Sequence, residues 1–343
     1  MSERLSRLTA DLVADALLSR GAPPGVFSLV TGFEAGNALI DHPAITAASF
    51  TGSLNGGRAL YDRAAGRPTP IPFFAEMGSV NPVVITRAAD TARGAELAAG
   101  LAGSFQLGAG QFCTKPGVVF VPRLSRTERA LAGLVGTQRS RMLTPSIAEG
   151  FQSGLRDLLG VPGLEVLAGG KQDSGPEAQP IVLATTVQVL IEHADTVLTE
   201  VFGPVTVLVR YGDETELLAA LDLLEGSLTA TIHSEPDDAL STVVARLEQV
   251  AGRLLFGGWP TGVAVAWSQH HGGPWPSTST QHSSVGATAV RRFQRPVAYQ
   301  DAPQGLLPEA LRDGNPLGIP RRINGVLYLG EVAPNLRGNP TDV

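Results

Sequence analysis

Cys113 is the only cysteine of the chain, and it lies in a glycine-rich turn. Glycines stand on both sides of it in the segment Gly108–Gly117, between a helical pattern and an apolar run. Backbone N–H groups in such a turn can stabilise the oxyanion that forms when a thiolate attacks a carbonyl. Lys115, or a helix N-terminus, would lower the thiol pKa. The segment therefore predicts a nucleophile. The alternative is a buried structural thiol, and a single cysteine excludes an intramolecular disulfide and a zinc site made of cysteines.

Glu76 ends an apolar run that begins at Phe73. Beside an apolar wall its pKa would rise toward neutrality, which is the property of a general base. The alternative is a solvated carboxylate at the end of a strand, and the position alone favours neither interpretation.

Two further segments have the composition of ligand-binding turns. Thr51–Gly57 follows an apolar run and opens a helical pattern, and its small residues would let a phosphate approach backbone N–H groups. It matches neither Gly-x-Gly-x-x-Gly nor a phosphate loop ending in Gly-Lys-Ser/Thr. Glu200 precedes Phe202 and Pro204. This segment indicates either a structural turn or a carboxylate that hydrogen-bonds a ribose diol beside an aromatic side chain.

His270 and His271 stand side by side, shortly before Trp275. Adjacent histidines can indicate a metal site, but no third ligand is suitably spaced and the sequence has no His-Glu-x-x-His pattern. We expect a structural or pocket-lining loop here, and no metal.

The elements that position these residues alternate between helical and strand-like patterns, which predicts an α/β fold with a parallel sheet. A first block has helical patterns at Leu5–Leu17, Ala35–Ile40 and Leu54–Ala65, and strand patterns at Val26–Val30, Ile45–Phe50 and Phe73–Met77. A second block has strand patterns at Val83–Ile85, Val118–Val121, Ile181–Leu183, Val187–Ile191, Val205–Tyr211, Thr229–His233 and Leu254–Phe256. Its helical patterns are Asp90–Leu107, Glu128–Val135, Ser146–Leu159, Glu214–Leu224 and Asp237–Val250.

Composition narrows the class of protein. The 343 residues allow one large or two ordinary domains, and 43% apolar residues support a core. A net charge of -6 gives no basic surface for nucleic acid. No apolar run approaches the roughly 18 residues of a membrane span, and the first residues lack an export signal. These features predict a cytoplasmic protein.

Taken together, four segments resemble the aldehyde dehydrogenase superfamily, in the order that the family has them: Phe50–Gly57, Glu76–Gly78, Gly110–Cys113 and Glu200–Pro204. Other segments are similar to the branch that contains 2-oxoglutarate semialdehyde dehydrogenases and bacterial NADP-dependent enzymes: Arg67–Pro82, Gly257–Val263, Gly272–Pro276 and Asn315–Arg321. The resemblance implies oxidation of a short aldehyde bearing a carboxylate, with NADP or NAD as cofactor, in a homodimer or homotetramer.

The resemblance also implies roles for the two chemistry-bearing residues. Cys113 would attack the aldehyde and form a thiohemiacetal, which becomes a thioester after hydride loss. Glu76 would activate the water that hydrolyses the thioester and would also deprotonate Cys113. The backbone N–H of Cys113 would be half of the oxyanion hole.

Cofactor roles are implied in the same way. Gly52, Ser53 and Gly57 would lie at the cofactor pyrophosphate. Glu200 would hold the nicotinamide ribose, and Phe202 would pack near the ring.

The resemblance predicts three parts: residues 1–77 as the C-terminal part of an incomplete Rossmann-type dinucleotide domain, 78–285 as a complete α/β catalytic domain, and 286–343 as a return segment and C-terminal tail. Family segments that carry an oxyanion asparagine and a cofactor-binding lysine have no counterpart here. We expect a misassigned start, a decayed gene or a stable shortened form. The alternatives in function are an impaired remnant or oligomerisation partner of a full-length relative, and a thiol esterase that needs no cofactor.

Overall fold

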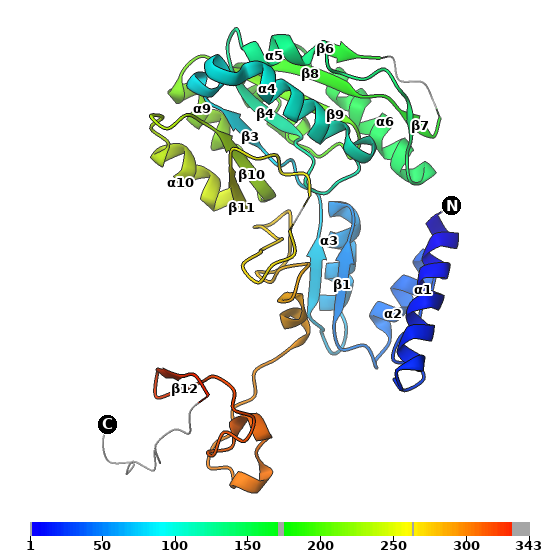
Figure 1. Ribbon diagram of the computed structural model, residues 1–343. Helices are drawn as coiled ribbons and strands as arrows, with labels where there is room; N and C mark the ends of the chain where they lie inside the picture. The colour runs from blue at the N-terminus through cyan, green and yellow to red at the C-terminus, as the bar shows by residue number, and fades with distance from the viewer. Residues whose placement is uncertain (1, 171–174, 263, 331–343) are drawn as a thin grey trace. The chain divides into compact units, whose positions relative to one another are not determined.

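The computed structural model describes residues 2–170, 175–262 and 264–330 (Figure 1). The chain forms two compact units, residues 1–293 and 294–343. The domain boundaries at residues 77 and 285 stay predictions.

A seven-stranded sheet is the centre of the first unit, and all neighbouring strands are parallel except one antiparallel edge pair. Its spatial order is β11 (Ala251–Phe256), β10 (Ser227–His233), β3 (Val83–Ile85), β4 (Val118–Pro122), β9 (Val205–Tyr211), β8 (Ile181–Thr186) and β6 (Glu165–Gly169). The antiparallel pair is β6 with β8. Helices that link parallel strands must cover both faces of such a sheet.

Both faces of the sheet are buried under helices, as Figure 1 shows. Along β4, Val118 and Phe120 face one apolar cluster, while Val119 and Val121 face the other, because successive side chains of a strand point to opposite sides. The first cluster includes residues of α6 (Pro145–Leu159), α7 (Val187–Glu192), α8 (Ala194–Val197), α9 (Glu214–Leu221) and α10 (Ser241–Val250). The second includes residues of α4 (Arg87–Gln106) and α5 (Arg126–Leu131).

A two-stranded parallel sheet stands apart from the seven-stranded one in the first unit. β1 (Ala48–Thr51) pairs with β2 (Phe73–Glu76), and α3 (Leu54–Ala65) connects them. This small α/β layer has its own apolar cluster, which includes Ala64, Ala75 and Met77. Two helices precede it, α1 (Ser2–Ser19) and α2 (Phe33–Asp41).

Two further strand pairs are short. The strands β5 (Ser140–Arg141) and β7 (Glu177–Ala178) pair with each other. In the second unit, β12 (Arg321–Ile323) and β13 (Val326–Tyr328) form a hairpin through Asn324 and Gly325. Both turn residues have positive φ, 46° and 82°, as a two-residue hairpin turn of this kind requires. The last part of the predicted tail, residues 331–343, lies outside the described residues.

The α/β fold class is confirmed, and three local predictions are wrong. The run Val187–Ile191 is helix α7, because the Thr186 hydroxyl accepts a hydrogen bond from the Val189 N–H and caps it. A short apolar run carries no periodicity that separates a strand from a helix. Val26–Val30 forms no strand, and the predicted strands of the second block omit the edge strand β6.

Candidate active site

Cys113 lies in a loop between α4 and β4 whose path depends on left-handed backbone. Gly108, Ala109 and Gly110 have φ of 57°, 58° and 65° in a single 3-10 turn. A Cβ on Gly110 would collide with the backbone carbonyl of Gly203. The glycine therefore brings the Cys113 loop against the turn that follows Glu200.

The other end of this loop is fixed by a buried side chain. The amide of Asn81 donates hydrogen bonds to the backbone carbonyl of Cys113 at 2.8 Å and to that of Lys115 at 3.0 Å. Its carbonyl oxygen accepts from the hydroxyls of Ser79 and Thr229. The nucleophile loop is thus anchored to β10 and to the start of β3 through one asparagine.

Glu76, Cys113 and His271 come together in one cluster, although they lie far apart in the sequence. His271 Nε2 lies 3.1 Å from Glu76 Oε1 and 3.5 Å from Cys113 Sγ. Ser284 donates from its hydroxyl to the second oxygen of Glu76. The side chains of Glu76 and His271 are only 5% and 4% exposed, whereas Cys113 is partly exposed. The geometry is that of a thiol nucleophile beside an imidazole and a carboxylate.

The segment that carries His271 runs beside β2. Met77 donates its N–H to the carbonyl of Ser277 at 2.7 Å, and Ser279 donates its N–H to the carbonyl of Ala75. Glu76 itself pairs with Thr278 in an isolated antiparallel bridge. The sequence predicts only a structural or pocket-lining role for His271, and the contact with the thiol is not predicted. The adjacent glycines and prolines marked a loop, but nothing local indicated its neighbours.

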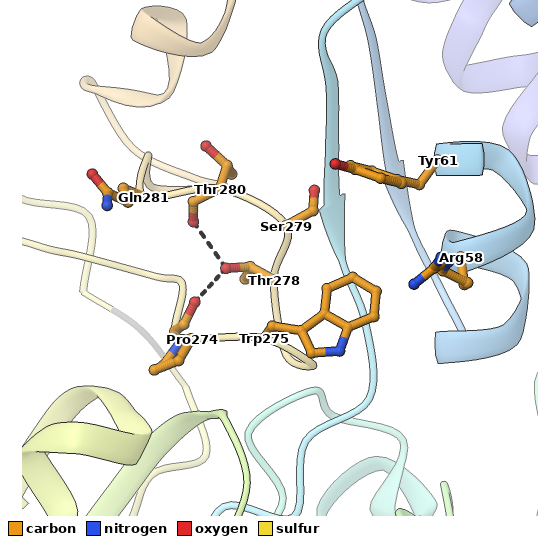
Figure 2. A pocket seen from close by; sticks show the side chains of 9 residues that line it. Arg58, Tyr61, Pro274, Trp275, Thr278, Ser279, Thr280 and Gln281 are labelled. Carbon is orange, nitrogen blue, oxygen red and sulfur yellow. Dashed lines mark hydrogen bonds between the residues drawn. The ribbon is translucent and has the colours of Figure 1, made fainter. Parts of the chain in front are cut away.

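A pocket of about 370 Å³ is lined by residues of the same segment and of α3. Figure 2 shows Arg58 and Tyr61 of α3 on one wall and Trp275 to Gln281 on the other. The guanidinium of Arg58 lies 5.9 Å from the centre of the Trp275 ring. Since Thr278 both lines this pocket and pairs with Glu76, the pocket and the cluster share one supporting segment.

Two expected pKa shifts are wrong. Burial and the negative charge of Glu76 raise the pKa of Cys113 to about 12. Lys115 does not oppose this shift, because it is 2% exposed and its Nζ donates to the carbonyl of Val205 at 2.8 Å. The pKa of Glu76 is lowered rather than raised: burial raises it, but hydrogen bonds from His271 and Ser284 outweigh burial. At rest the cluster therefore holds a thiol beside a carboxylate.

Glu200 and Lys115 line one small cavity of about 10 Å³. Burial raises the pKa of Glu200 and lowers that of Lys115, and the attraction between the two groups opposes both shifts. The Glu200 carboxylate lies against Gly78, where an added Cβ would be 2.9 Å from Oε2. The structure thus places Glu200 near the Glu76–Gly78 segment, and Phe202 is half-buried beside it.

The predicted phosphate-binding segment begins α3. The Ser53 hydroxyl caps this helix by accepting from the Gly56 N–H at 3.2 Å, and Gly52 donates its N–H to the carbonyl of Glu76. Gly52 and Ser53 are exposed. Gly57 is buried against Met77, whose sulfur occupies the space of a Cβ. Exposed small residues at the start of a 12-residue helix fit a phosphate.

The profile of the aldehyde dehydrogenase family matches residues 2–294. The chain belongs to this family. It is 42% identical over 330 residues to an alpha-ketoglutaric semialdehyde dehydrogenase of Acinetobacter baylyi, which covers 94% of the chain and 63% of that relative. It is 44% identical to alpha-ketoglutaric semialdehyde dehydrogenase 2 of Azospirillum brasilense, with 93% and 63% covered. The chain therefore spans about 63% of the length of these aldehyde dehydrogenase relatives.

Solved structures agree on the aldehyde dehydrogenase fold. A proline utilization A variant of Bradyrhizobium japonicum superposes with a TM-score of 0.71 at 24% identity, covering 85% of this chain and 30% of that one. Gamma-glutamyl-gamma-aminobutyraldehyde dehydrogenase of Burkholderia cenocepacia gives 0.69 at 21% identity, covering 83% and 58%. The resemblance predicted from four separate motifs is confirmed. Among the described residues of this aldehyde dehydrogenase family member, we find no helix with the length and apolar character of a membrane span.

Proposed function

We propose that this protein oxidises an aldehyde to its carboxylic acid with NADP or NAD, and that the aldehyde is alpha-ketoglutaric semialdehyde or a similar short one. The observation that carries the proposal is the contact of His271 Nε2 with both Cys113 Sγ and Glu76 Oε1. The names of the relatives from Acinetobacter baylyi and Azospirillum brasilense support the substrate.

Cys113 acts as the nucleophile. Because the raised pKa keeps the thiol protonated at rest, its proton must leave as sulfur attacks the carbonyl carbon. The Glu76 carboxylate is the group in contact that accepts it, because His271 Nε2 already donates its proton to that carboxylate. The product is a thiohemiacetal on Cys113, whose oxyanion lies near the backbone N–H of Cys113. NADP or NAD supplies the hydride acceptor when bound.

Glu76 then acts as the base for hydrolysis. Its lowered pKa keeps the carboxylate ionised, which is the form that accepts a proton from water, and makes it a weaker base than a carboxylate with a pKa near neutrality. Ser284 holds one carboxylate oxygen and His271 the other, so the orientation of Glu76 is fixed before water arrives. Water attacks the Cys113 thioester, and the acid leaves as the thiol is restored.

Cofactor binding is assigned to residues from two elements. Gly52 and Ser53 face the pyrophosphate at the exposed start of α3, and Gly57 lets α3 pack close to Met77 behind it. Glu200 holds the nicotinamide ribose and Phe202 packs near the ring. Support comes from the packing of Gly110 on Gly203, which brings the Glu200 turn to the nucleophile loop.

We also propose three parts along the chain. Residues 1–77, 78–285 and 286–343 form the cofactor part, the catalytic domain and the return segment with the tail. The two-stranded and the seven-stranded sheets fall wholly within the first and second ranges. Exposed leucines on α1 suit a homodimer or homotetramer, and an unpaired catalytic thiol suits the reducing cytoplasm.

The test is hydride transfer from alpha-ketoglutaric semialdehyde to NADP or NAD, measured on the 343-residue chain and on a version carrying the upstream segment of its relatives. The proposal expects reduced cofactor from the longer protein and none from its Cys113→Ala variant. If the longer protein neither binds nor reduces the cofactor, the proposal is wrong.

A thiol esterase is the second candidate, because the Cys113, His271 and Glu76 cluster is complete without any cofactor residue. The 343-residue chain should then hydrolyse an activated ester such as p-nitrophenyl acetate. An unchanged rate in Cys113→Ala would exclude this activity.

A further inference from the structure

The cluster of Glu76, Cys113 and His271 has a second chemical property besides nucleophilic reactivity. A sulfur, an imidazole nitrogen and a carboxylate oxygen lie within 4.8 Å of one another. These three donor types are the ones that zinc takes in mixed sites, where three protein ligands leave a fourth position open.

The distances can be compared with those of a tetrahedral site. Zinc binds sulfur at about 2.3 Å, and nitrogen and carboxylate oxygen at about 2.0–2.2 Å. At a tetrahedral angle these bonds separate sulfur from nitrogen by roughly 3.5 Å and nitrogen from oxygen by roughly 3.4 Å. The observed separations are 3.5 Å for Cys113 to His271 and 3.1 Å for His271 to Glu76. Cys113 Sγ and the Glu76 oxygen lie within 4.8 Å of each other, so two of the three donor separations already suit a cation at the common centre and the third is bounded.

Charge and donor type favour a thiophilic dication over calcium or magnesium. Sulfur and imidazole nitrogen are poor ligands for the hard cations, which prefer oxygen. Binding forms a metal–sulfur bond and breaks the S–H bond, with the proton released to solvent. The thiolate and the Glu76 carboxylate then offset both positive charges in a site whose walls are largely buried.

Surrounding contacts hold the donors in place. Ser284 donates to the Glu76 oxygen that faces away from His271. His271 is fixed at its backbone, because its N–H donates to Ser283 and its carbonyl accepts from the Ser284 N–H. Within the described residues, the buried Nδ1 of His271 has no hydrogen-bond partner. With Nε2 on a metal, the ring proton is carried by Nδ1.

We propose that Cys113, His271 and Glu76 form a binding site for a single thiophilic divalent cation of the zinc class, and that the bound cation reversibly blocks the nucleophile. The partly exposed sulfur gives the cation an entry path and leaves its fourth position to water. The site uses side chains of the proposed aldehyde reaction, but its occupancy is measured without aldehyde or cofactor.

The test uses the 343-residue chain, freed of metal with a chelator and then titrated with Co²⁺. We expect one Co²⁺ per chain, with the intense visible bands of tetrahedral cobalt and a thiolate-to-cobalt charge-transfer band, and displacement of both by Zn²⁺. Cys113→Ala should abolish the charge-transfer band, and Ser284→Ala should weaken binding by roughly tenfold. His270→Ala is the matched control and should bind as the parent does.

A second measurement needs no variant. Zn²⁺ at one equivalent should protect Cys113 from iodoacetamide, and a chelator should restore alkylation. Any one of four results would overturn the proposal. They are the absence of a charge-transfer band, weak octahedral spectra, equal Co²⁺ binding by Cys113→Ala, and alkylation that Zn²⁺ does not affect. These results would leave the aldehyde reaction untouched, because they involve no turnover.

Discussion

The side-chain amide of Asn81 donates to the backbone carbonyl of Cys113 at 2.8 Å, across 32 residues of sequence. Asn81 is completely buried and has a φ of 48°, a left-handed conformation that asparagine adopts more readily than most residues. Its side-chain amide donates to the backbone carbonyls of Cys113 and Lys115, and its side-chain oxygen accepts hydrogen bonds from two hydroxyls. The position of the nucleophile thus depends on a residue that touches no reacting atom.

Asn81→Ala should therefore destabilise the protein and loosen the nucleophile loop. It leaves buried carbonyls and hydroxyls without partners, at about 1–3 kcal/mol for each unsatisfied group. Urea unfolding measures the loss of stability. The separate effects on KM and on kcat of ester hydrolysis measure the displacement of Cys113. Asn81→Asp is the matched control, since it keeps the left-handed preference and the acceptor but loses the amide donor. Parent-like stability in Asn81→Ala would show that the side-chain hydrogen bonds of Asn81 are not significant.

Glu76→Gln should have opposite effects on two reactions of Cys113. The negative charge of Glu76 helps to hold the thiol pKa near 12, so the neutral amide should lower that pKa and speed alkylation by iodoacetamide at a fixed pH. Loss of the base should at the same time slow hydrolysis, so that a thioester on Cys113 accumulates and is seen by mass spectrometry.

Both reactions of the Glu76→Gln variant are measured with a chelator present. Thr280→Ala, in the segment that packs beside β2, serves as the control and should keep the parent rates. Slower alkylation in Glu76→Gln would mean that losing Glu76 as proton acceptor of the thiol outweighs losing the charge that keeps the thiol protonated.

Local signals explain which parts of the fold the sequence predicted. The bounds of α3 agree with the prediction because Ser53 caps its start and Gly66 follows its end, and both are neighbours in sequence. The central strands β3 and β4 were found because they are buried on both faces and read as continuous apolar runs.

The candidate site was only partly predictable. Cys113 and Glu76 stand in family-like motifs, but His271 is 195 residues from Glu76, and their contact exists only after the segment 271–284 has packed beside β2. The pKa expectations failed for a related reason. Lys115 is two residues from Cys113 in sequence, yet its side chain points into the cavity with Glu200. Sequence distance does not give side-chain direction in a loop.

Gly110→Ala should unfold or badly weaken the protein, whereas Gly103→Ala should not. At Gly110 a Cβ meets the backbone of Gly203 and the φ is 65°, so the strain and the clash should cost about 2–4 kcal/mol together. Gly103 lies in α4 with open space at its Cβ, and alanine there should add up to about 1 kcal/mol of stability. Thermal unfolding of both variants measures the difference. Similar melting temperatures would contradict the close approach of the two loops.

His233 should make the stability of the protein depend on pH between about 6.5 and 4. Burial lowers its pKa to about 4, and it packs on Trp259 with 4.5 Å between ring centroids. Within the described residues neither ring nitrogen has a hydrogen-bond partner. In the unfolded chain the His233 imidazole is protonated below its ordinary pKa of 6.5. In the folded chain it is protonated only below its lowered pKa of about 4.

The stability that the neutral His233 contributes is therefore complete above pH 6.5 and is lost as the pH falls to 4, by at most about 3 kcal/mol. Urea unfolding at a series of pH values measures this slope. Subtracting the same series for His233→Phe, which keeps an aromatic ring against Trp259 and cannot titrate, isolates the contribution of the histidine. A difference that does not change between pH 7 and 4 would show that the imidazole is protonated equally in the folded and unfolded chains.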